Sequence, residues 1–402
     1  MPNVTQLKHL EHLEDEMLNY GVEGCKASVG FLQELRKMLG CDNSTGFMQT
    51  KWDGIPAVVC GINPRTGNFF IGTKSVFNKD EPKLASTENG IDMYYGHQPD
   101  LAEKLKICFK YLSKMEIKGV IQGDFLAAKS DIKTETVHGE RLYTFGNQAL
   151  TYGIPVDHPI GIKIKNAEMV IVFHTHYKGD HVPTMNARAG TGETLKEIKE
   201  VALINNDTPM HKVGLDHQEE VKFDKHVSDI EKMCKTCGDF LDELVTKKGT
   251  TGDEKWHIAS YVKQFFNAEI KAARSVSNID KSFEGLYNFY YDKTKAMLSK
   301  LKTTNTKVAK ASLVHSSLNY LEDNKLKFKA MLGLYKELQT VKQMVIDKLD
   351  HLEKFRTFAR TENGYKVTGP EGYVLHKDGD MVKLVNRLEF SYINFTLAKS
   401  WR

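Results

Sequence analysis

Hydrophobic positions change their spacing along the chain and so divide it into segments. They recur every three or four residues over 7–17 and 31–39, which predicts two N-terminal helices ending at Gly21 and Gly40. From about residue 47 to 177 the apolar runs are short and separated by polar turns, which indicates strands. The expected strands are 57–62, 68–73, 119–126 and 168–174, with one helix over 101–112.

Helical spacing then resumes and continues through most of the second half of the chain. It is clearest over 227–244 and 334–352, and strand texture returns at 373–375 and 382–385. The pattern predicts an α+β protein whose sheets are interrupted by a large all-helical insertion. The expected divisions are N-terminal helices packing on the core (1–45), the first part of the core (46–190), the insertion (191–362) and closing strands (363–402).

Composition narrows the class of protein. Of the 402 residues, 27% are charged and 41% hydrophobic, which is typical of a globular chain. The net charge is only +4, so any affinity for nucleic acid must come from local patches. No apolar run approaches the roughly 18 residues of a membrane span, and the N-terminus lacks a signal pattern. Six cysteines are few for this length, so we expect a cytoplasmic protein without a disulfide framework.

Lys51-Trp52-Asp53-Gly54 is the first candidate for chemistry, because it combines a lysine, a carboxylate and a glycine just before an apolar strand. An amine attacks phosphorus only when neutral, so a nucleophilic lysine needs a pKa lowered by burial or by nearby cations. The alternative is a surface lysine before a turn.

Three further sites place charge in or beside apolar strands. Asp124 lies within the run 120–126, Glu371 stands at the entry of a strand, and Lys383 is flanked by valine and leucine. A buried carboxylate needs a lysine or a metal as partner. The simpler interpretations are a strand-end aspartate for Asp124 and a lysine that protects an edge strand for Lys383.

Other constellations are weaker. The stretch 293–320 has no acidic residue, which would suit phosphate contacts or a solvated helix face equally well. Its candidate nucleic-acid-binding residues are Lys293, Lys295, Lys300, Lys302, Lys307 and Lys310. Cys234 and Cys237 suit core packing better than zinc, and His174 and His176 lack a third metal ligand.

Five stretches, taken together and in this order, resemble the covalent nucleotidyltransferase superfamily of ATP-dependent DNA and RNA ligases and mRNA capping enzymes. The stretches are Lys51-Trp52-Asp53-Gly54, Gly123-Asp124-Phe125, Val172-Phe173-His174, Glu371-Gly372-Tyr373-Val374 and Val382-Lys383-Leu384. The first of them, with residues 12–15 and 119–125, also looks like a group of ligase-like proteins from large tailed bacteriophages. The resemblance implies an adenylation domain of antiparallel sheets. Only 19 residues follow Lys383, so we expect no C-terminal OB domain.

The resemblance also implies a chemistry. Lys51 would attack the α-phosphate of ATP to give lysyl-AMP, and AMP would pass to a 5′-phosphate end that a 3′-hydroxyl then joins. Asp53 would orient Lys51 or the ribose, while Asp124 and Glu371 would hold Mg²⁺ or Mn²⁺. The expected partner is RNA or DNA carrying such ends, and the expected state is a monomer, in the host cytoplasm if the gene is viral.

The remaining nucleotide contacts implied by the resemblance are Lys383 on the α-phosphate, Lys74 on a phosphate or the ribose, and Phe173 stacked on adenine. The sequence departs from the family at Lys74, where relatives have arginine, and at Val385, where they have a second lysine. A GTP-dependent capping enzyme and a catalytically inactive nucleic-acid-binding relative therefore stay open as alternatives.

The hairpin near the C-terminus offers a geometric test. A two-residue loop would put Lys383 and Glu371 on opposite faces, whereas a three-residue loop, 378–380, would put them on the same face. Since the proposed chemistry needs both on one face, we expect a three-residue or bulged turn.

Overall fold

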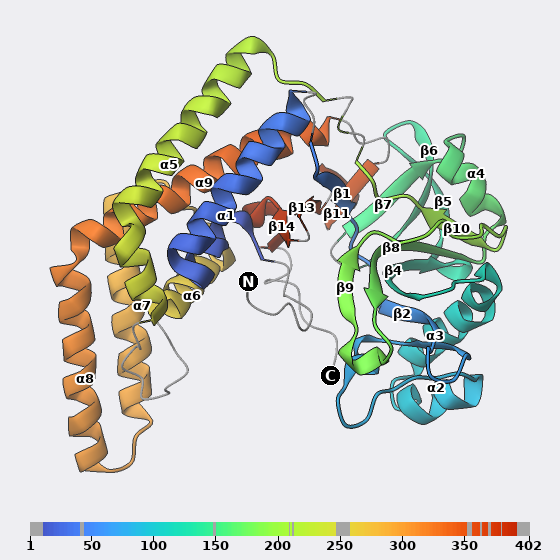
Figure 1. The fold of residues 1–402 in the computed structure, drawn as a ribbon, viewed down its shortest axis with the longest axis horizontal. Helices are drawn as coiled ribbons and strands as arrows, with labels where there is room; N and C mark the ends of the chain where they lie inside the picture. Colours follow the sequence, from blue (N-terminus) through green and yellow to red (C-terminus); the bar gives the residue numbers. More distant parts are fainter. Residues whose placement is uncertain are drawn as a thin grey trace. The chain divides into compact units, whose positions relative to one another are not determined.

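The computed structural model describes residues 11–40, 44–147, 150–208, 210, 213–246, 258–351, 356–361, 364–368, 371–378 and 380–391 (Figure 1). These residues form two compact units. The first is drawn from Met48–Thr208 and Glu353–Gly379, and the second from Leu10–Phe47, Pro209–Leu352 and Asp380–Arg402. The mixed α+β fold with mostly antiparallel sheets and a long helical segment is as the sequence predicts.

The first unit is centred on a six-stranded sheet in the order β10-β8-β4-β2-β3, with β9 pairing β8. Among the pairs with described register only β10 and β8 run parallel, and β2–β3, β2–β4, β4–β8 and β8–β9 are antiparallel. The strands are β2 (Ala57–Ile62), β3 (Phe69–Gly72), β4 (Val120–Ala128), β8 (Met169–Lys178), β9 (Asn186–Ala189) and β10 (Val201–Ile204).

Both faces of this sheet are buried, because side chains alternate along its strands. Val58 and Ile121 join the larger core, which includes apolar residues of helices α2 (Glu88–Tyr95) and α3 (Pro99–Leu112). Val59 and Val120 join the smaller core on the other side, with Tyr177. The central strand β2 is apolar along its length, as a strand covered on both faces requires, whereas β9 carries exposed Asn186 and Arg188.

A second sheet in the order β12-β11-β7-β6-β5 joins chain segments that lie about two hundred residues apart. In its register Phe358 pairs with Thr151 and Thr144 with Lys133. Its strands are β5 (Lys133–Val137), β6 (Glu140–Gly146), β7 (Leu150–Pro155), β11 (Arg356–Thr361) and β12 (Gly364–Thr368), and α4 (Pro159–Asn166) follows β7. A third sheet contributes β1 (Phe47–Lys51) and its neighbour β13 (Gly372–Lys377) to this unit. Short helical turns are η2 (Lys74–Phe77), η3 (Ser113–Met115), η4 (Lys129–Asp131) and η5 (Val182–Thr184).

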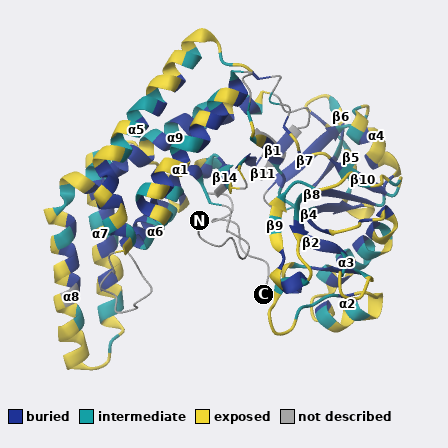
Figure 2. Cartoon of the chain, viewed as in Figure 1, coloured by how far each residue is buried: buried dark blue, intermediate teal, exposed yellow. Residues whose placement is uncertain are grey.

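The second unit is helical. It contains η1 (Leu13–Asp15), α1 (Glu16–Leu39), α5 (His217–Thr246), α6 (Ile258–Lys271), α7 (Ile279–Ser299), α8 (Thr304–Asp323), α9 (Lys325–Asp350), β14 (Asp380–Leu384) and the π-helix η7 (Arg387–Ser391). Buried and exposed residues follow opposite sides of α5 (Figure 2), with Phe223, Ile230 and Leu241 on the buried side. The apolar positions at helical spacing in the sequence therefore correspond to the buried side of α5.

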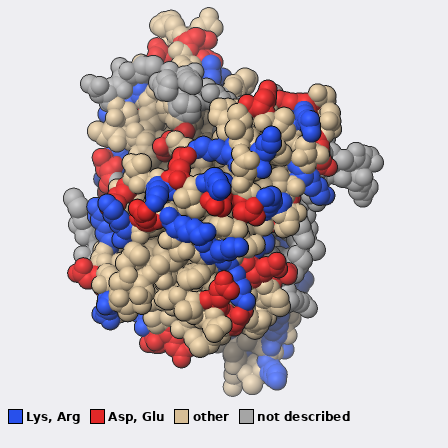
Figure 3. Space-filling view, turned by 90° about the vertical axis from the view of Figure 1, so that its right-hand side faces the viewer, with Lys and Arg blue, Asp and Glu red and all other residues tan. Residues whose placement is uncertain are grey.

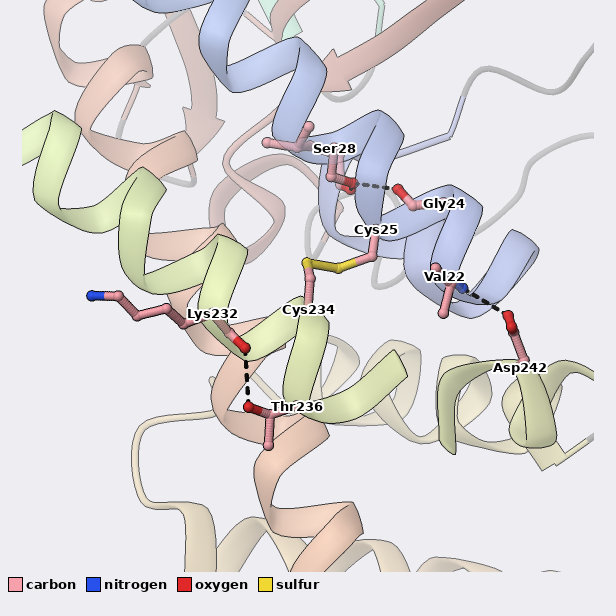
Figure 4. Close-up of a disulfide and its surroundings, with 9 residues drawn as sticks. Val22, Gly24, Cys25, Ser28, Lys232, Cys234, Thr236 and Asp242 are labelled. Atoms are coloured by element: carbon pink, nitrogen blue, oxygen red, sulfur yellow. Dashed lines mark hydrogen bonds between the residues drawn. A yellow bond between two sulfur atoms is a disulfide. The ribbon is translucent and has the colours of Figure 1, made fainter. Parts of the chain in front are cut away.

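One expectation for the N-terminus is confirmed and one is wrong. The stretch Glu16–Leu39, α1, has non-helical dihedrals at Gly21, so two helical segments meet there at a kink, as the sequence predicts. The expected packing on the sheet core is wrong, because α1 belongs to the helical unit and packs on α5. Gly21 has φ +60, and a Cβ there would lie 2.1 Å from Asp242 Oδ1, so the kink needs glycine. The Val22 N–H donates to that same carboxylate over 2.8 Å (Figure 4).

A disulfide joins α1 to α5, between Cys25 and Cys234 (Figure 4). The expectation of cysteines without disulfides is therefore wrong for this pair. The spacing rules could not find it, because the two cysteines are 209 residues apart in sequence. Cys237 is a free, buried thiol, as the core-packing interpretation predicts. Among the described residues no helix has the length and apolarity to cross a membrane.

Candidate active site

Lys51 is the last residue of β1, and the next residue, Trp52, anchors the chain where it leaves the strand. Trp52 is buried and its ring lies 4.6 Å from that of Tyr152 on β7. An aromatic pair at this separation anchors the turn that follows the strand. The Lys51 side chain keeps 23% of its surface exposed.

Glu371 is the partner of Lys51. It directly precedes β13, the neighbour of β1 in the third sheet, and its carboxylate forms an ion pair with Lys51 Nζ. Only 12% of its side chain is exposed. Strand pairing thus joins two charged residues that are 320 positions apart in sequence.

Asp53 is held in place by groups from the second sheet. Asn147 donates its side-chain N–H to Asp53 Oδ2 over 2.6 Å, and the Asp53 backbone N–H donates to the Tyr152 hydroxyl over 2.6 Å. Gly54 then passes so close to β4 that a Cβ would lie 2.6 Å from the Phe125 carbonyl oxygen and 2.9 Å from Asp124 Cβ. The glycine of the motif is therefore required for the close approach of this loop to Asp124.

Asp124 lies on β4 opposite Val172 of β8, beside a β-bulge. Gln122 pairs with Thr175 and Gly123 with Phe173, so His174 is the extra residue on β8. A Cβ on Gly123 would lie 2.1 Å from the Val172 carbonyl oxygen, so only glycine fits there. A bulge turns the side chain of its extra residue. His174 accordingly places Nε2 3.5 Å from Asp124 Oδ2.

The expected stacking of Phe173 on adenine is wrong. Phe173 is 2% exposed and belongs to the core on the helix-covered side of the sheet, with Ile171 and Phe125. Phe173 shares the face of Ile171 through the ordinary alternation of β8, while the bulged residue His174 keeps 28% of its side chain exposed. His174 is thus the ring at this position that a ligand could reach.

The charges around Lys51 are unequal, since three carboxylates face one ammonium. Burial alone would lower the pKa of Lys51, but the charges of Glu371, Asp53 and Asp124 outweigh it and raise the pKa. The expected lowering is therefore wrong for the protein without ligands. Burial also raises the pKa of Glu371 to about 7, against the opposing effect of Lys51.

A polar layer lies behind Lys51 in the same unit. His376 of β13 is buried and shares a 2.9 Å hydrogen bond with Gln49 of β1, which donates to Asn206. Burial, and then the nearby His174, lower the pKa of His376 to about 4. His376 is therefore neutral at neutral pH and adds no positive charge to the site.

The donor set suits a magnesium ion shared with a substrate rather than a closed metal cage. In the described part of the chain no three His, Cys, Asp or Glu side chains converge as metal ligands. Mg²⁺ usually takes one or two protein carboxylates and completes its shell with phosphates and water. Asp124 and Glu371 supply such oxygens in a region of excess negative charge, so they fit this ion.

The remaining predicted nucleotide contacts are Lys74 and Lys383. Lys74 is exposed at the start of η2 and forms no ion pair with any described residue. Lys383 is on β14 in the helical unit, where its N–H donates to the Glu11 carbonyl over 2.8 Å. β13 ends at Lys377 and β14 begins at Asp380, and the turn between them includes Gly379, which lies outside the described residues. The three-residue or bulged turn therefore stays a prediction.

The candidate nucleic-acid lysines lie at the end of α7, at the start of α8 and in the segment between them. Five of the six are exposed and Lys310 is half-buried. Lys293 and Lys295 lie over the rings of Phe289 and Tyr291, at 5.4 and 5.9 Å from the centroids. The face drawn in Figure 3, by contrast, intermixes lysine and arginine with many carboxylates. Ion pairs within the sheet unit include Lys129–Glu168 and Lys163–Glu197.

Sequence reasoning missed three side chains that position the site: Tyr152, Asn147 and His376. Each lies in an ordinary strand or turn, and its role depends on pairing between distant segments. Gly123 was the available signal for the bulge, because a glycine inside an apolar strand often marks one.

Comparison with known proteins assigns the chain to a family. No curated protein and no solved structure matches the chain. Residues 3–399 match a family of unknown function, DUF6267. Since the match covers almost the whole length, this chain is a member of the DUF6267 family.

Proposed function

We propose that this protein is an ATP-dependent polynucleotide ligase, which joins 3′-hydroxyl and 5′-phosphate ends of RNA or DNA through a lysyl-AMP intermediate. The observation that carries the proposal is the contact of Lys51 with Glu371, beside Asp53 and Asp124. These are the residues through which the sequence resembles covalent nucleotidyltransferases, and they come together from strands far apart in the chain. The sheet unit would then be the adenylation domain, interrupted by the helical segment.

In the first step the Lys51 nitrogen forms a bond to the α-phosphorus of ATP, the bond from that phosphorus to the bridging oxygen breaks, and pyrophosphate leaves. The attacking amine must first lose a proton. Glu371 is placed to accept it, because it contacts Lys51 Nζ and its pKa of about 7 lets it hold a proton near neutral pH. Asp53, fixed by Asn147, then keeps the amine oriented.

A divalent cation fits beside this amine. Bound by Asp124, Glu371 and the phosphates, Mg²⁺ would offset negative charge and thereby lower the pKa of Lys51. His174 would contact the base or ribose in the place first assigned to Phe173. In the later steps AMP passes from Lys51 to the 5′-phosphate, and the 3′-hydroxyl displaces AMP as the phosphodiester forms.

The lysines of α7, α8 and the intervening segment would bind the polynucleotide backbone. All of them but Lys310 are exposed, so phosphates could approach those five side chains. Aromatic rings beside Lys293 and Lys295 offer surfaces on which bases could stack. Binding through this stretch should weaken steeply as salt rises.

The decisive experiment incubates the protein with Mg²⁺ and α-labelled ATP or GTP and separates it on a denaturing gel. Label from ATP should be retained, and Lys51→Ala should abolish it. Lys118→Ala is the matched control, because Lys118 is an exposed lysine of the same unit outside the site. Labelling from GTP alone would replace the ligase with a capping-type guanylyltransferase. No label from either, with nucleic acid still bound, would identify an inactive binding relative.

A further inference from the structure

The helical unit contains a cavity of about 280 Å³ that the proposed ligase chemistry does not use. It is bounded by α6 and the segment after it, by α9, and by the segment that leads into η7. Its size is close to the lower end of the range for small-molecule sites.

Two buried cations line this cavity. Arg387 is 6% and Lys342 is 3% exposed. Both are tied to carboxylates of η1: Lys342 donates to Glu14 over 2.5 Å, and Arg387 Nη1 lies 3.2 Å from Asp15 Oδ1. Arg387 also donates to the Tyr335 hydroxyl over 2.8 Å. These contacts hold the two cations rigidly in the cavity wall.

Arg387 nevertheless keeps one unused donor. Its Nη1 and Nη2 groups donate to Asp15, Tyr335 and Asn267, but Nε is buried and has no hydrogen-bond partner. A buried N–H without an acceptor is destabilising, because it has lost its hydrogen bonds to water. An acceptor atom on a ligand in the cavity would remove that destabilisation.

The charge of the lining favours an anion. Arg274 and Lys336 add two cations to the lining, and Glu269, which pairs with Arg274 over 2.6 Å, is the one acidic residue among the described lining residues. Even with Glu14 and Asp15 counted behind the wall, four cations face three carboxylates. The lining also contains apolar residues, among them Ile270, Val276 and Val385.

We propose that this cavity binds a small organic phosphate, with its phosphate group against Arg387 and Lys342 and its apolar body against Ile270 and Val276. Arginine and lysine side chains bind phosphate oxygens well. Inorganic phosphate would leave the apolar part of the cavity unfilled, so an organic phosphate is the better fit. The inference does not rest on the ligase proposal, because all of its residues belong to the helical unit.

Calorimetric titration of the full chain with phenyl phosphate tests the proposal. We expect one site with a Kd between about 1 μM and 1 mM, and at least about tenfold weaker binding of inorganic phosphate and of phenol, each of which lacks half of the ligand. No heat of binding up to about 10 mM would overturn the proposal. Benzoate binding more tightly than phenyl phosphate would overturn the choice of phosphate.

Variants locate the site. Thr340→Phe places a ring in the cavity from α9 without touching the ion pairs, and should weaken binding at least about tenfold. Leu326→Phe is the matched control, since Leu326 is 81% exposed on the same helix and does not line the cavity. Arg387→Lys should weaken binding as well, and Thr340→Phe still decides the matter if that variant does not fold. Binding lost in Lys51→Ala but kept in Thr340→Phe would place the ligand in the sheet unit and refute the inference.

Discussion

Each unit contains a cluster of charged side chains, and the two clusters differ in balance and in exposure. In the sheet unit one cation, Lys51, faces three carboxylates, and 23% of its side chain is exposed. In the helical unit two cations face two carboxylates, and none of the four side chains is more than 6% exposed.

The comparison shows how a cluster that could bind a ligand or react differs from a cluster that stabilises the fold. In a balanced, buried cluster the charges neutralise one another, and the residues rigidify the elements that carry them, even where single atoms such as Arg387 Nε lack a hydrogen-bond partner. An unbalanced and partly exposed cluster needs something from outside to neutralise it, such as a metal ion or a change of protonation. By this criterion we assign the proposed chemistry to the Lys51 cluster and expect the Glu14 cluster to stabilise its unit.

The largest predicted effect is on the balanced cluster. Lys342→Met removes the nearer cation of buried Glu14 and leaves only Arg387, 3.9 Å away, so it should lower the free energy of unfolding by about 3–5 kcal/mol, measured by chemical denaturation. Lys348→Met, which removes a partly exposed ion pair on the same helix, should cost less than about 1 kcal/mol. Equal losses in the two variants would contradict the distinction drawn between the clusters.

A smaller effect concerns the polar layer behind Lys51. Because the pKa of His376 is lowered from 6.5 to about 4, the unfolded chain binds the proton more readily than the folded one between these values. Stability from this group is complete above pH 6.5 and is lost as the pH falls toward 4, by about 1.4 kcal/mol per pH unit.

His376→Gln should remove that loss, because glutamine can still bond to Gln49 and does not titrate. Between pH 6.5 and 5 the wild type should lose about 2 kcal/mol more than the variant, as followed by thermal unfolding at each pH. Parallel curves for the two proteins would show that His376 is not buried in its neutral form.

The smallest predicted effect tests the excess of carboxylates over cations around Lys51. Glu371→Gln removes one of the carboxylates that raise the pKa of Lys51, so the amine should be neutral more often at a given pH. Its modification by an amine-reactive reagent at pH 8 should become severalfold faster, as read by mass spectrometry. Exposed Lys118 supplies an internal control whose rate should not change. An unchanged rate at Lys51 would mean that Glu371 does not control its protonation.

Local pattern predicts much of this fold and less of the site. The strand expected at 57–62 is Ala57–Ile62, and the helix expected at 101–112 is Pro99–Leu112, because alternation and helical spacing are properties of a few neighbouring residues. The packing of α1 on α5 and the Cys25–Cys234 bond depend on segments some two hundred residues apart, about which local spacing carries no information.

The site shows the same limit. The resemblance assigned Lys51 and Glu371 to one site but did not predict their ion pair, because no local rule pairs β1 with β13. The wrong expectation for Phe173 came from the family resemblance, whereas the alternation of β8 already puts Phe173 on the buried face of Ile171. The raised pKa of Lys51 required knowing how many carboxylates the fold brings to one amine.

The discontinuous sheet unit has a consequence for synthesis. Its last strands are β11–β13, so the ribosome must translate the whole of α5–α9 before β7 can meet β11 or Lys51 can meet Glu371. At about 5–20 residues per second, those 320 positions amount to a delay on the order of tens of seconds. During that interval the nascent chain exposes an unfinished sheet edge, and it carries no assembled active site until the helical unit has already emerged.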